Sequence, residues 1–409
     1  MKVTFDRLFP CRNLAREVQR LDDRLATRFD HVMQSVMSEF ERQRSQVDAL
    51  AVRHEQSRAE FERHIADAIS APRPRRLFIS TGFFATAMAA SIVRQQGRTF
   101  DDYLLVTLDR QSAEDNCRWA FQLNDDWAAV RTVGHGQYYE RTETCTALPF
   151  SDLRFDEVYS PFVEMAEFVQ RTFIAQQHHF YEEGLTSYLQ AMRLAPSDTH
   201  SRFFALAAAL MRRADIRTVP IDREEFGRVL RRASQCYRIP RFSDRRNVVI
   251  AAGGVPLGES EHPHAMFDPY DELAGKLIEK GYVVWLKGHP RRPREALREA
   301  FRTSRLAKLG VRLLELDAPL LEIVLACNPH SIAAIVSVYS SVLVHAFALF
   351  GIPAFSLHDG PVSAGSARWK DIQDAIVPDV AELVEADFDD VQRVACEFHN
   401  RGLATELDV

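Results

Sequence analysis

The sequence predicts an α/β protein with two Rossmann-like domains that follow a long N-terminal helix. A chain of 409 residues is too long for a single hydrophobic core. Apolar strand-like runs alternate with helical stretches from about residue 75 to 360, which is typical of doubly wound parallel sheets. Residues 11–70 contain neither glycine nor proline, and they follow a helical pattern.

The N-terminal segment is predicted to be one amphipathic or coiled-coil helix. Its apolar residues recur at three- and four-residue steps. They are Leu14, Val18, Leu21, Leu25, Phe29, Val32, Val36 and Phe40. Pro72 and Pro74 end the helix in a linker. The helix either docks onto its own globular part or forms an oligomerisation stalk. We favour the stalk, and hence a homo-oligomer, because a lone helix cannot bury such a stripe.

A first α/β half follows the linker. Its predicted strands are residues 77–80, 103–108 and 156–160, and its predicted helices are residues 83–96, 112–121 and 161–177. Strand, helix and strand at this spacing begin a doubly wound sheet. Residues 197–243 are charged and rich in arginine, and we expect them to be helical and to bridge the two halves.

A second α/β half begins at residue 247. Its predicted strands are residues 247–252, 282–286, 311–316, 332–336 and 351–355, with a helix over 269–280 and helical structure from Lys370 onward. We therefore expect an N-terminal segment and linker over residues 1–74. Domains over residues 75–243 and 244–380 and a helical tail over 381–409 complete the chain.

Composition narrows the class of protein. A net charge of −6 and a pI near 6.2 give no overall electrostatic reason to bind nucleic acid. Six scattered cysteines without a CxxC pair indicate reduced thiols and no structural zinc, as in a cytoplasmic protein.

The first residues carry charge where a signal peptide needs an apolar core. The longest apolar run, residues 342–350, is interrupted by His345 and is interpreted as a core helix. The Arg-rich linker also allows peripheral association with the inner membrane.

A histidine at the end of an apolar strand is the first candidate site. His289 and Pro290 follow the strand 282–286, and Lys287, Arg291 and Arg292 flank them. Proline restricts the backbone, so the imidazole can project from the strand end. Next to these cations it suits a phosphate and can offset charge on a departing oxygen. The alternative is a histidine in a surface loop.

Paired hydroxyls end the strand 332–336. Ser340 and Ser341 stand where a helix begins, and hydroxyls together with free helix amides form a metal-free anion site. A serine there can equally be a simple N-cap, and both roles are compatible. Because parallel strands converge at their carboxyl ends, the serines and His289 are expected to face one nucleotide-linked ligand.

Glu182-Glu183-Gly184, expected between two helices, is the candidate acid–base site. Two carboxylates beside a glycine turn can present one acid to a cleft, where a raised pKa lets it take a proton. The alternative is a solvated helix end.

Two further features belong to the predicted donor site. Gly253 and Gly254 end a strand, where they either let the backbone approach a ligand closely or form a plain turn. Glu322 begins a helix, where it either accepts hydrogen bonds from ribose or favours the helix dipole.

The order of an acidic pair with glycine, an HP dipeptide and a serine pair resembles the motifs of bacterial sialyltransferases. It is most similar to the α-2,8-polysialyltransferase family, with the related lipooligosaccharide sialyltransferases, over about residues 75–380. The strand 77–80 followed by Thr81 and Gly82 also resembles that family's first strand and acceptor-side loop.

This resemblance implies a GT-B fold, a CMP-sialic acid donor, a glycan acceptor, and inversion without metal or cofactor. It makes Glu182 the general base, with Glu183 as the substitute if the register differs by one residue. His289 would contact the CMP phosphate and act as general acid or electrostatic stabiliser, and Ser340 and Ser341 would hold that phosphate. Glu322 would lie near the ribose.

Two other functions remain open from the sequence. CDP-glycerol-type phosphotransferases also show an HP element and a serine pair, but they usually carry aspartate where this chain has Val338. A coiled-coil assembly protein with an inactive transferase-like domain is the second alternative, and the retained Glu182, His289 and serines argue against it.

Overall fold

The protein is described from a computed structural model, which forms two compact units, Met1–Arg73 and Pro74–Val409. The structure describes residues 11–70, 73–97, 99–107, 113–134, 138, 148–161, 163–192, 201–211, 216–252, 266–289, 293–362 and 366–404. Pro290, Gly253 and Gly254 of the predicted donor site lie outside these residues.

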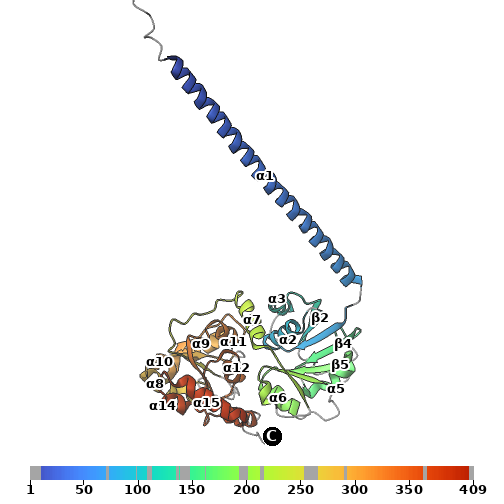
Figure 1. Ribbon diagram of the computed structural model, residues 1–409. Helices are drawn as coiled ribbons and strands as arrows, with labels where there is room; N and C mark the ends of the chain where they lie inside the picture. Colours follow the sequence, from blue (N-terminus) through green and yellow to red (C-terminus); the bar gives the residue numbers. More distant parts are fainter. Residues whose placement is uncertain are drawn as a thin grey trace, which may run out of the picture. The chain divides into compact units, whose positions relative to one another are not determined.

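The first unit contains the predicted long helix, α1 (Cys11–Ser70) (Figure 1). Its apolar stripe is exposed along the helix. The exposed members are Val18, Leu21, Leu25, Phe29, Val32, Met33, Val36, Met37, Phe40, Val47 and Leu50, with exposed fractions from 43% to 66%. The long helix is thus confirmed, while the coiled coil stays a prediction.

In the second unit, the described residues of the first half form a seven-stranded parallel sheet in the order β3-β2-β1-β4-β5-β6-β7. Its strands are β1 (Arg75–Ser80), β2 (Asp101–Thr107), β3 (Ala129–Val133), β4 (Arg154–Ser160), β5 (Ile174–Tyr181), β6 (Arg202–Ala205) and β7 (Arg217–Pro220). Its helices are α2 (Phe83–Gln96), α3 (Ala113–Leu123), α5 (Ala166–Thr172), α6 (Leu185–Met192) and α7 (Arg223–Ser234). The expected Rossmann-like start is confirmed.

Two secondary-structure predictions for this half were wrong. The helix predicted over 161–177 ends at Thr172, and β5 begins at Ile174. The helical region predicted over 197–243 contains β6 and β7 before α7. Phe180 pairs with Phe203 in the ladder, and burial of these aromatic strand ends overrides the helix-like local sequence.

The described residues of the second half form a five-stranded parallel sheet in the order β10-β9-β8-β11-β12. Its strands are β8 (Asn247–Ala251), β9 (Val283–Lys287), β10 (Arg312–Leu313), β11 (Ile332–Ser337) and β12 (Ala354–Ser356). Its helices are α8 (Asp271–Glu279), α9 (Arg294–Thr303), α10 (Arg305–Leu309), α11 (Leu321–Cys327), α12 (Ser341–Phe350), α13 (Ala367–Ile376), α14 (Val380–Glu385) and α15 (Val391–Ala404). Two parallel sheets with covering helices confirm the predicted pair of Rossmann-like folds (Figure 1).

Apolar side chains of the two halves pack against each other in two buried clusters. One cluster of buried side chains contains Phe180 and Leu189 of the first half together with Val249 and Leu343 of the second. Helix α7 packs against α2 and α3 of the first half and also contacts α11 and α12. The packing of the two halves therefore brings the ends of their strands together.

Candidate functional site

The predicted motifs lie at the carboxyl ends of strands in both sheets. Glu182 follows β5, His289 follows β9, and Ser340 follows β11. In the second sheet, β8 and β11 are neighbours at the point where the strand order reverses, which is where open α/β sheets bind ligands. Of the predicted residues, the serine pair follows a strand at this switch point, and His289 follows the next strand, β9.

The acidic motif and the serine pair lie close together. A Cβ placed on Gly184 would lie 3.6 Å from Ser341 Oγ, which is ordinary van der Waals distance. The backbone of Gly184 has a φ of +149°, a region that favours glycine. The same two segments approach each other at Tyr339, where burial raises the pKa of the phenol and the nearby Thr186 side chain opposes that change. The motif follows a strand, β5, and not the helix predicted for it.

The two glutamates of the acidic motif have different surroundings. Glu182 is fully buried, and its Oε2 accepts hydrogen bonds from Tyr188 Oη at 2.5 Å and from the Leu206 amide at 2.8 Å. Glu183 is half-buried, and its carboxylate accepts a hydrogen bond from the Thr81 hydroxyl. Among the described atoms, none lies within 4 Å of a Cβ built on the neighbouring Gly82. Of the pair, Glu183 is thus the more exposed carboxylate.

His345 joins the two halves at this point. Its Nε2 lies 3.0 Å from Glu182 Oε1, and its Nδ1 lies 3.0 Å from Glu322 Oε1. All three side chains are buried, and the imidazole stacks on the ring of Phe84 with centroids 4.7 Å apart. Helices α12 and α11 of the second half thereby hold the end of β5 in the first.

This arrangement keeps His345 charged. Burial alone would lower its pKa, but hydrogen bonds to Glu182 and Glu322 outweigh burial and raise the pKa to about 9. Burial likewise opposes the charge of Glu322, yet the hydrogen bond from His345 leaves its pKa below the usual range. Burial, together with the Glu182 charge, raises the pKa of Tyr188 far above 10, so this hydroxyl stays a hydrogen-bond donor.

Lys287 and His289 lie at and just beyond the end of β9. Lys287 is the last residue of β9, and burial lowers its pKa to about 8, although attraction to Glu322 opposes the change. Its Nζ donates to the Gly288 carbonyl at 2.7 Å. His289 lies two residues beyond the strand and is partly exposed. An anion binding beside Lys287 would favour its protonated form.

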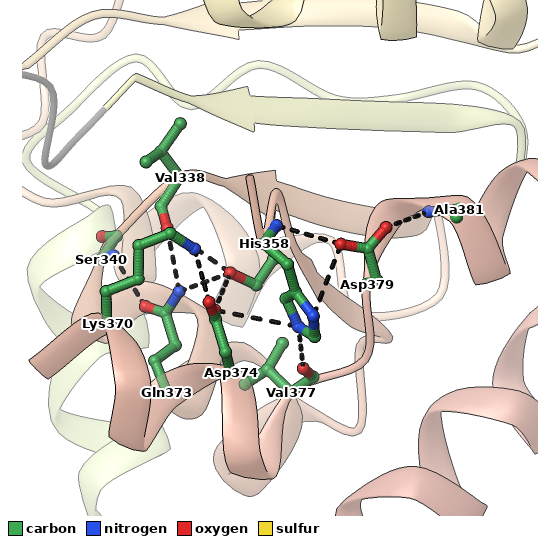
Figure 2. A network of polar contacts seen from close by, with 10 residues as sticks. Val338, Ser340, His358, Lys370, Gln373, Asp374, Val377, Asp379 and Ala381 are labelled. Atoms are coloured by element: carbon green, nitrogen blue, oxygen red, sulfur yellow. Dashed lines mark hydrogen bonds and ion pairs between the residues drawn. The ribbon is translucent and has the colours of Figure 1, made fainter. Parts of the chain in front are cut away.

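A second polar cluster fixes the serine loop. Ser340 caps α12 by accepting a hydrogen bond from the Val342 amide at 3.3 Å, so the N-cap interpretation is correct. Its own amide donates to Gln373 Oε1 at 3.0 Å, and Gln373 Nε2 donates to the Val338 carbonyl at 3.1 Å (Figure 2). Gln373 Nε2 also donates to Ser356 Oγ at 2.8 Å, and Lys370 bonds to Asp374 at 2.6 Å.

Two predicted residues have partners that the sequence did not indicate. Glu322 was expected near ribose and Glu182 was expected to receive a proton, but His345 bonds to both carboxylates. One sign of this contact is visible in the sequence, because His345 is the titratable residue in the otherwise apolar stretch 342–350. Its two acidic partners are far away in sequence, so spacing alone could not reveal them.

Two features are absent from the described residues of the chain. In that part of the chain, no group of three or more His, Cys, Asp or Glu residues is arranged to hold a metal ion. Within the same residues, no helix combines the length and apolar character needed to cross a membrane.

Comparison with known proteins supports the motif assignment over part of the chain. Several solved structures are similar at low identity. E. coli heptosyltransferase WaaC with ADP is 14% identical, with a TM-score of 0.41, over 81% of this chain and 100% of that chain. Phytolacca americana UGT2, complexed with UDP-2fluoro-glucose and pterostilbene, is 11% identical, with a TM-score of 0.46, over 81% of this chain and 94% of that chain.

A third solved structure, Acinetobacter baumannii MurG, is 13% identical, with a TM-score of 0.38, over 81% of this chain and 92% of that chain. No curated protein sequence matches the chain. The family model described as alpha-2,8-polysialyltransferase (POLYST) matches residues 262–359, about a quarter of the chain. The matched stretch contains His289, Glu322, Ser340 and Ser341, and it confirms the resemblance to this family.

Proposed function

We propose that the protein is a glycosyltransferase that moves sialic acid, or a related nonulosonic acid, from its CMP form to a glycan acceptor. The observation that carries the proposal is the close approach of Gly184 to Ser341, and Lys287 ends a strand of the same sheet that precedes Ser341. An acidic motif from one sheet thereby meets an anion-binding loop from the other. The polysialyltransferase match over residues 262–359 supports the choice of sugar and nucleotide.

In the proposed reaction, an acceptor hydroxyl attacks the anomeric carbon of the donor sugar from the face opposite the phosphate. The new carbon–oxygen bond forms as the bond to CMP breaks, which inverts the anomeric configuration. The hydroxyl proton passes to a carboxylate of the acidic motif, and CMP leaves with the bonding electron pair. The site's main tasks are then to activate the acceptor and to offset charge on the phosphate.

We assign the general base to Glu183, with Glu182 as its support. Glu183 is partly exposed next to Thr81 and Gly82, whereas the buried Glu182 already accepts bonds from Tyr188, Leu206 and His345. A base must lie within hydrogen-bond reach of the proton it takes, and geometry therefore favours the exposed residue. The alternative assignment to Glu182 remains an outcome of the test below.

On the donor side, Lys287 and His289 offset the phosphate charge, and His289 protonates or stabilises the leaving oxygen. The Ser341 hydroxyl and the first amides of α12 hold the phosphate. These groups supply positive charge and hydrogen bonds without a metal ion, which is the mode we propose. The acceptor is a cell-surface polysaccharide or lipooligosaccharide, reached from the cytoplasm or from the membrane surface.

The experiment is a donor screen with purified protein over CMP-, CDP- and UDP-linked substrates, with products analysed by mass spectrometry. Transfer from CMP-sialic acid is expected, and Glu183→Gln should lower kcat by about 10²–10⁴-fold while CMP still binds. Glu279→Gln makes the same substitution at an exposed position of α8 and is a control that should leave kcat unchanged. Calorimetry should detect CMP binding by both variants.

Each other outcome identifies an alternative. Transfer from CDP-glycerol would favour the phosphotransferase. A larger loss of kcat in Glu182→Gln than in Glu183→Gln, with unchanged unfolding, would assign the base to Glu182. No binding of any nucleotide, together with His289→Ala leaving all cellular activity intact, would favour an assembly protein.

A further inference from the structure

Helix α1 carries an apolar stripe with a regular 11-residue period. Val18, Phe29 and Phe40 are each separated by 11 residues, and so are Leu25, Val36 and Val47. Leu21 and Val32 repeat at the same interval. Eleven residues correspond to three helical turns, a period that favours a right-handed supercoil and not the left-handed one of a heptad repeat. From Val18 to Val47 the stripe extends about 44 Å.

The exposure of the stripe and the charge of α1 indicate a protein partner. Its members keep about half or more of their surface exposed, for example Leu25 at 65% and Phe29 at 66%. α1 contains ten arginines, no lysine and eleven Asp and Glu residues, so its charge is nearly balanced. A helix that lies on an anionic membrane is usually rich in cations on its polar face, which α1 is not.

We propose that α1 pairs with α1 of a second copy of this chain, antiparallel and centred near Met33. In such a pair, a residue that precedes Met33 by some number of positions faces a residue of the second copy that follows Met33 by the same number, to within one position. Val18 then faces Val47 of the second copy, and Leu25 faces Phe40. Phe29 likewise faces Val36. Every one of these layers is apolar on both sides, which knobs-into-holes packing requires.

Charge complementarity selects this orientation. At the edges of the stripe, the antiparallel pair brings Asp22 opposite Arg44 of the second copy, and Arg28 opposite Glu39. Both pairs are attractive, and each occurs twice by symmetry. A parallel pair in register would instead bring Glu17 of one chain near Asp22 of the other. Edge charges of this kind set partner orientation in coiled coils.

The first test is sedimentation equilibrium of the full-length protein at micromolar concentration. A dimer of about twice the 46.7 kDa chain mass is expected. Phe29→Asp should yield monomer, because a charge would be buried in the seam. Gln34→Asp makes the same charge change outside the stripe and should leave the dimer intact. A wild-type monomer, or a dimer unaffected by Phe29→Asp, would overturn the proposal.

Orientation is tested by disulfide cross-linking against the unmodified protein as background. Val18→Cys chains mixed with Val47→Cys chains should cross-link, and Val18→Cys chains alone should not. Asp22→Arg and Arg44→Asp should each weaken the dimer several-fold, and the double variant should restore it. Efficient cross-linking of Val18→Cys alone, or a tighter dimer in Asp22→Arg, would show a parallel pair. These readouts need no nucleotide, so they stand apart from the proposed activity.

Discussion

Two polar clusters adjoin the Ser340–Ser341 loop, and they differ in kind. The His345 cluster, formed by His345, Glu182 and Glu322, is charged, buried and shared between the two sheets. The Gln373 cluster lies within the second half and holds the loop mainly through the neutral side chain of Gln373 (Figure 2). One cluster therefore sets the position of the acidic motif relative to the loop, and the other sets the shape of the loop.

The difference has an energetic consequence. Removing one partner from a buried charged cluster leaves an uncompensated charge, whereas removing a neutral amide leaves unpaired polar groups. The uncompensated buried charge lowers the free energy of unfolding more than the unpaired neutral groups do. We therefore expect loss of His345 to affect the stability of the whole unit, and loss of Gln373 to affect mainly the loop.

The largest effect is expected for His345→Ala. Glu182 and Glu322 would remain buried without their shared cation, at a cost of about 3–5 kcal/mol in the free energy of unfolding. Denaturant unfolding measures this. His330→Ala, at an exposed position of the same half, should change the value by less than about 0.5 kcal/mol. Equal effects of the two substitutions would contradict the role of the cluster.

The His345 cluster should also make stability depend on pH. A pKa of about 9 in the folded state, above the ordinary 6.5, means that its contribution is complete below about pH 6.5 and lost as pH rises through 9. Lys287 has the opposite effect on stability. Its pKa in the folded state, about 8, lies below the ordinary lysine value of 10.5, so its contribution to stability rises as the pH increases from about 8 to 10.5.

Unfolding measured from pH 6 to 10 in the Lys287→Met background isolates the His345 contribution. In this variant, the free energy of unfolding is expected to fall by on the order of 2–3 kcal/mol between pH 6 and pH 10. The groups that contact His345 are Phe84, Glu182 and Glu322. The Tyr188 hydroxyl bonds to Glu182, and burial raises its pKa so far that it stays neutral across this range. A flat profile in this background would mean that His345 is not charged.

A smaller effect is expected for Gln373→Ala. The Ser340 amide and the Val338 carbonyl would lose their partner, which costs about 2–3 kcal/mol and loosens the loop. If the loop holds phosphate, the Kd for CMP should rise more than tenfold in calorimetry. Gln392→Ala, which removes an exposed amide that bonds to the Gly351 carbonyl, is the matched control. Unchanged CMP affinity in Gln373→Ala would remove the loop from the donor site.

The smallest effect is expected for Lys287→Met, at about 1–2 kcal/mol of CMP binding. Phosphate favours protonated Lys287, so wild-type affinity should decline as pH rises above about 8, and binding near that pH should take up protons. Calorimetry in buffers of different ionisation enthalpy measures this uptake. If Lys287→Met still takes up protons when it binds CMP, another group is responsible for the proton uptake.

Some parts of the structure were predictable because local sequence dictates them. The helix over 83–96 was predicted at its observed bounds, and β1, β2, β8, β9 and β11 lie where continuous apolar runs indicated buried strands. By contrast, β5 has polar residues over 176–179 that give no clear period, and only its pairing with β4 and β6 makes it a strand. Local propensity yields to such tertiary contacts.

Periodicity and turn chemistry are local, so the long helix, the parallel α/β halves and the residue types that end each strand follow from the amino-acid pattern alone. Packing of the two halves, by contrast, selects which glutamate is buried and provides the partners of His345. The contact between His345 and Glu182 joins residues 163 positions apart. Such a contact exists only when two separately formed sheets pack together, and burial then sets the charge state that no sequence pattern encodes.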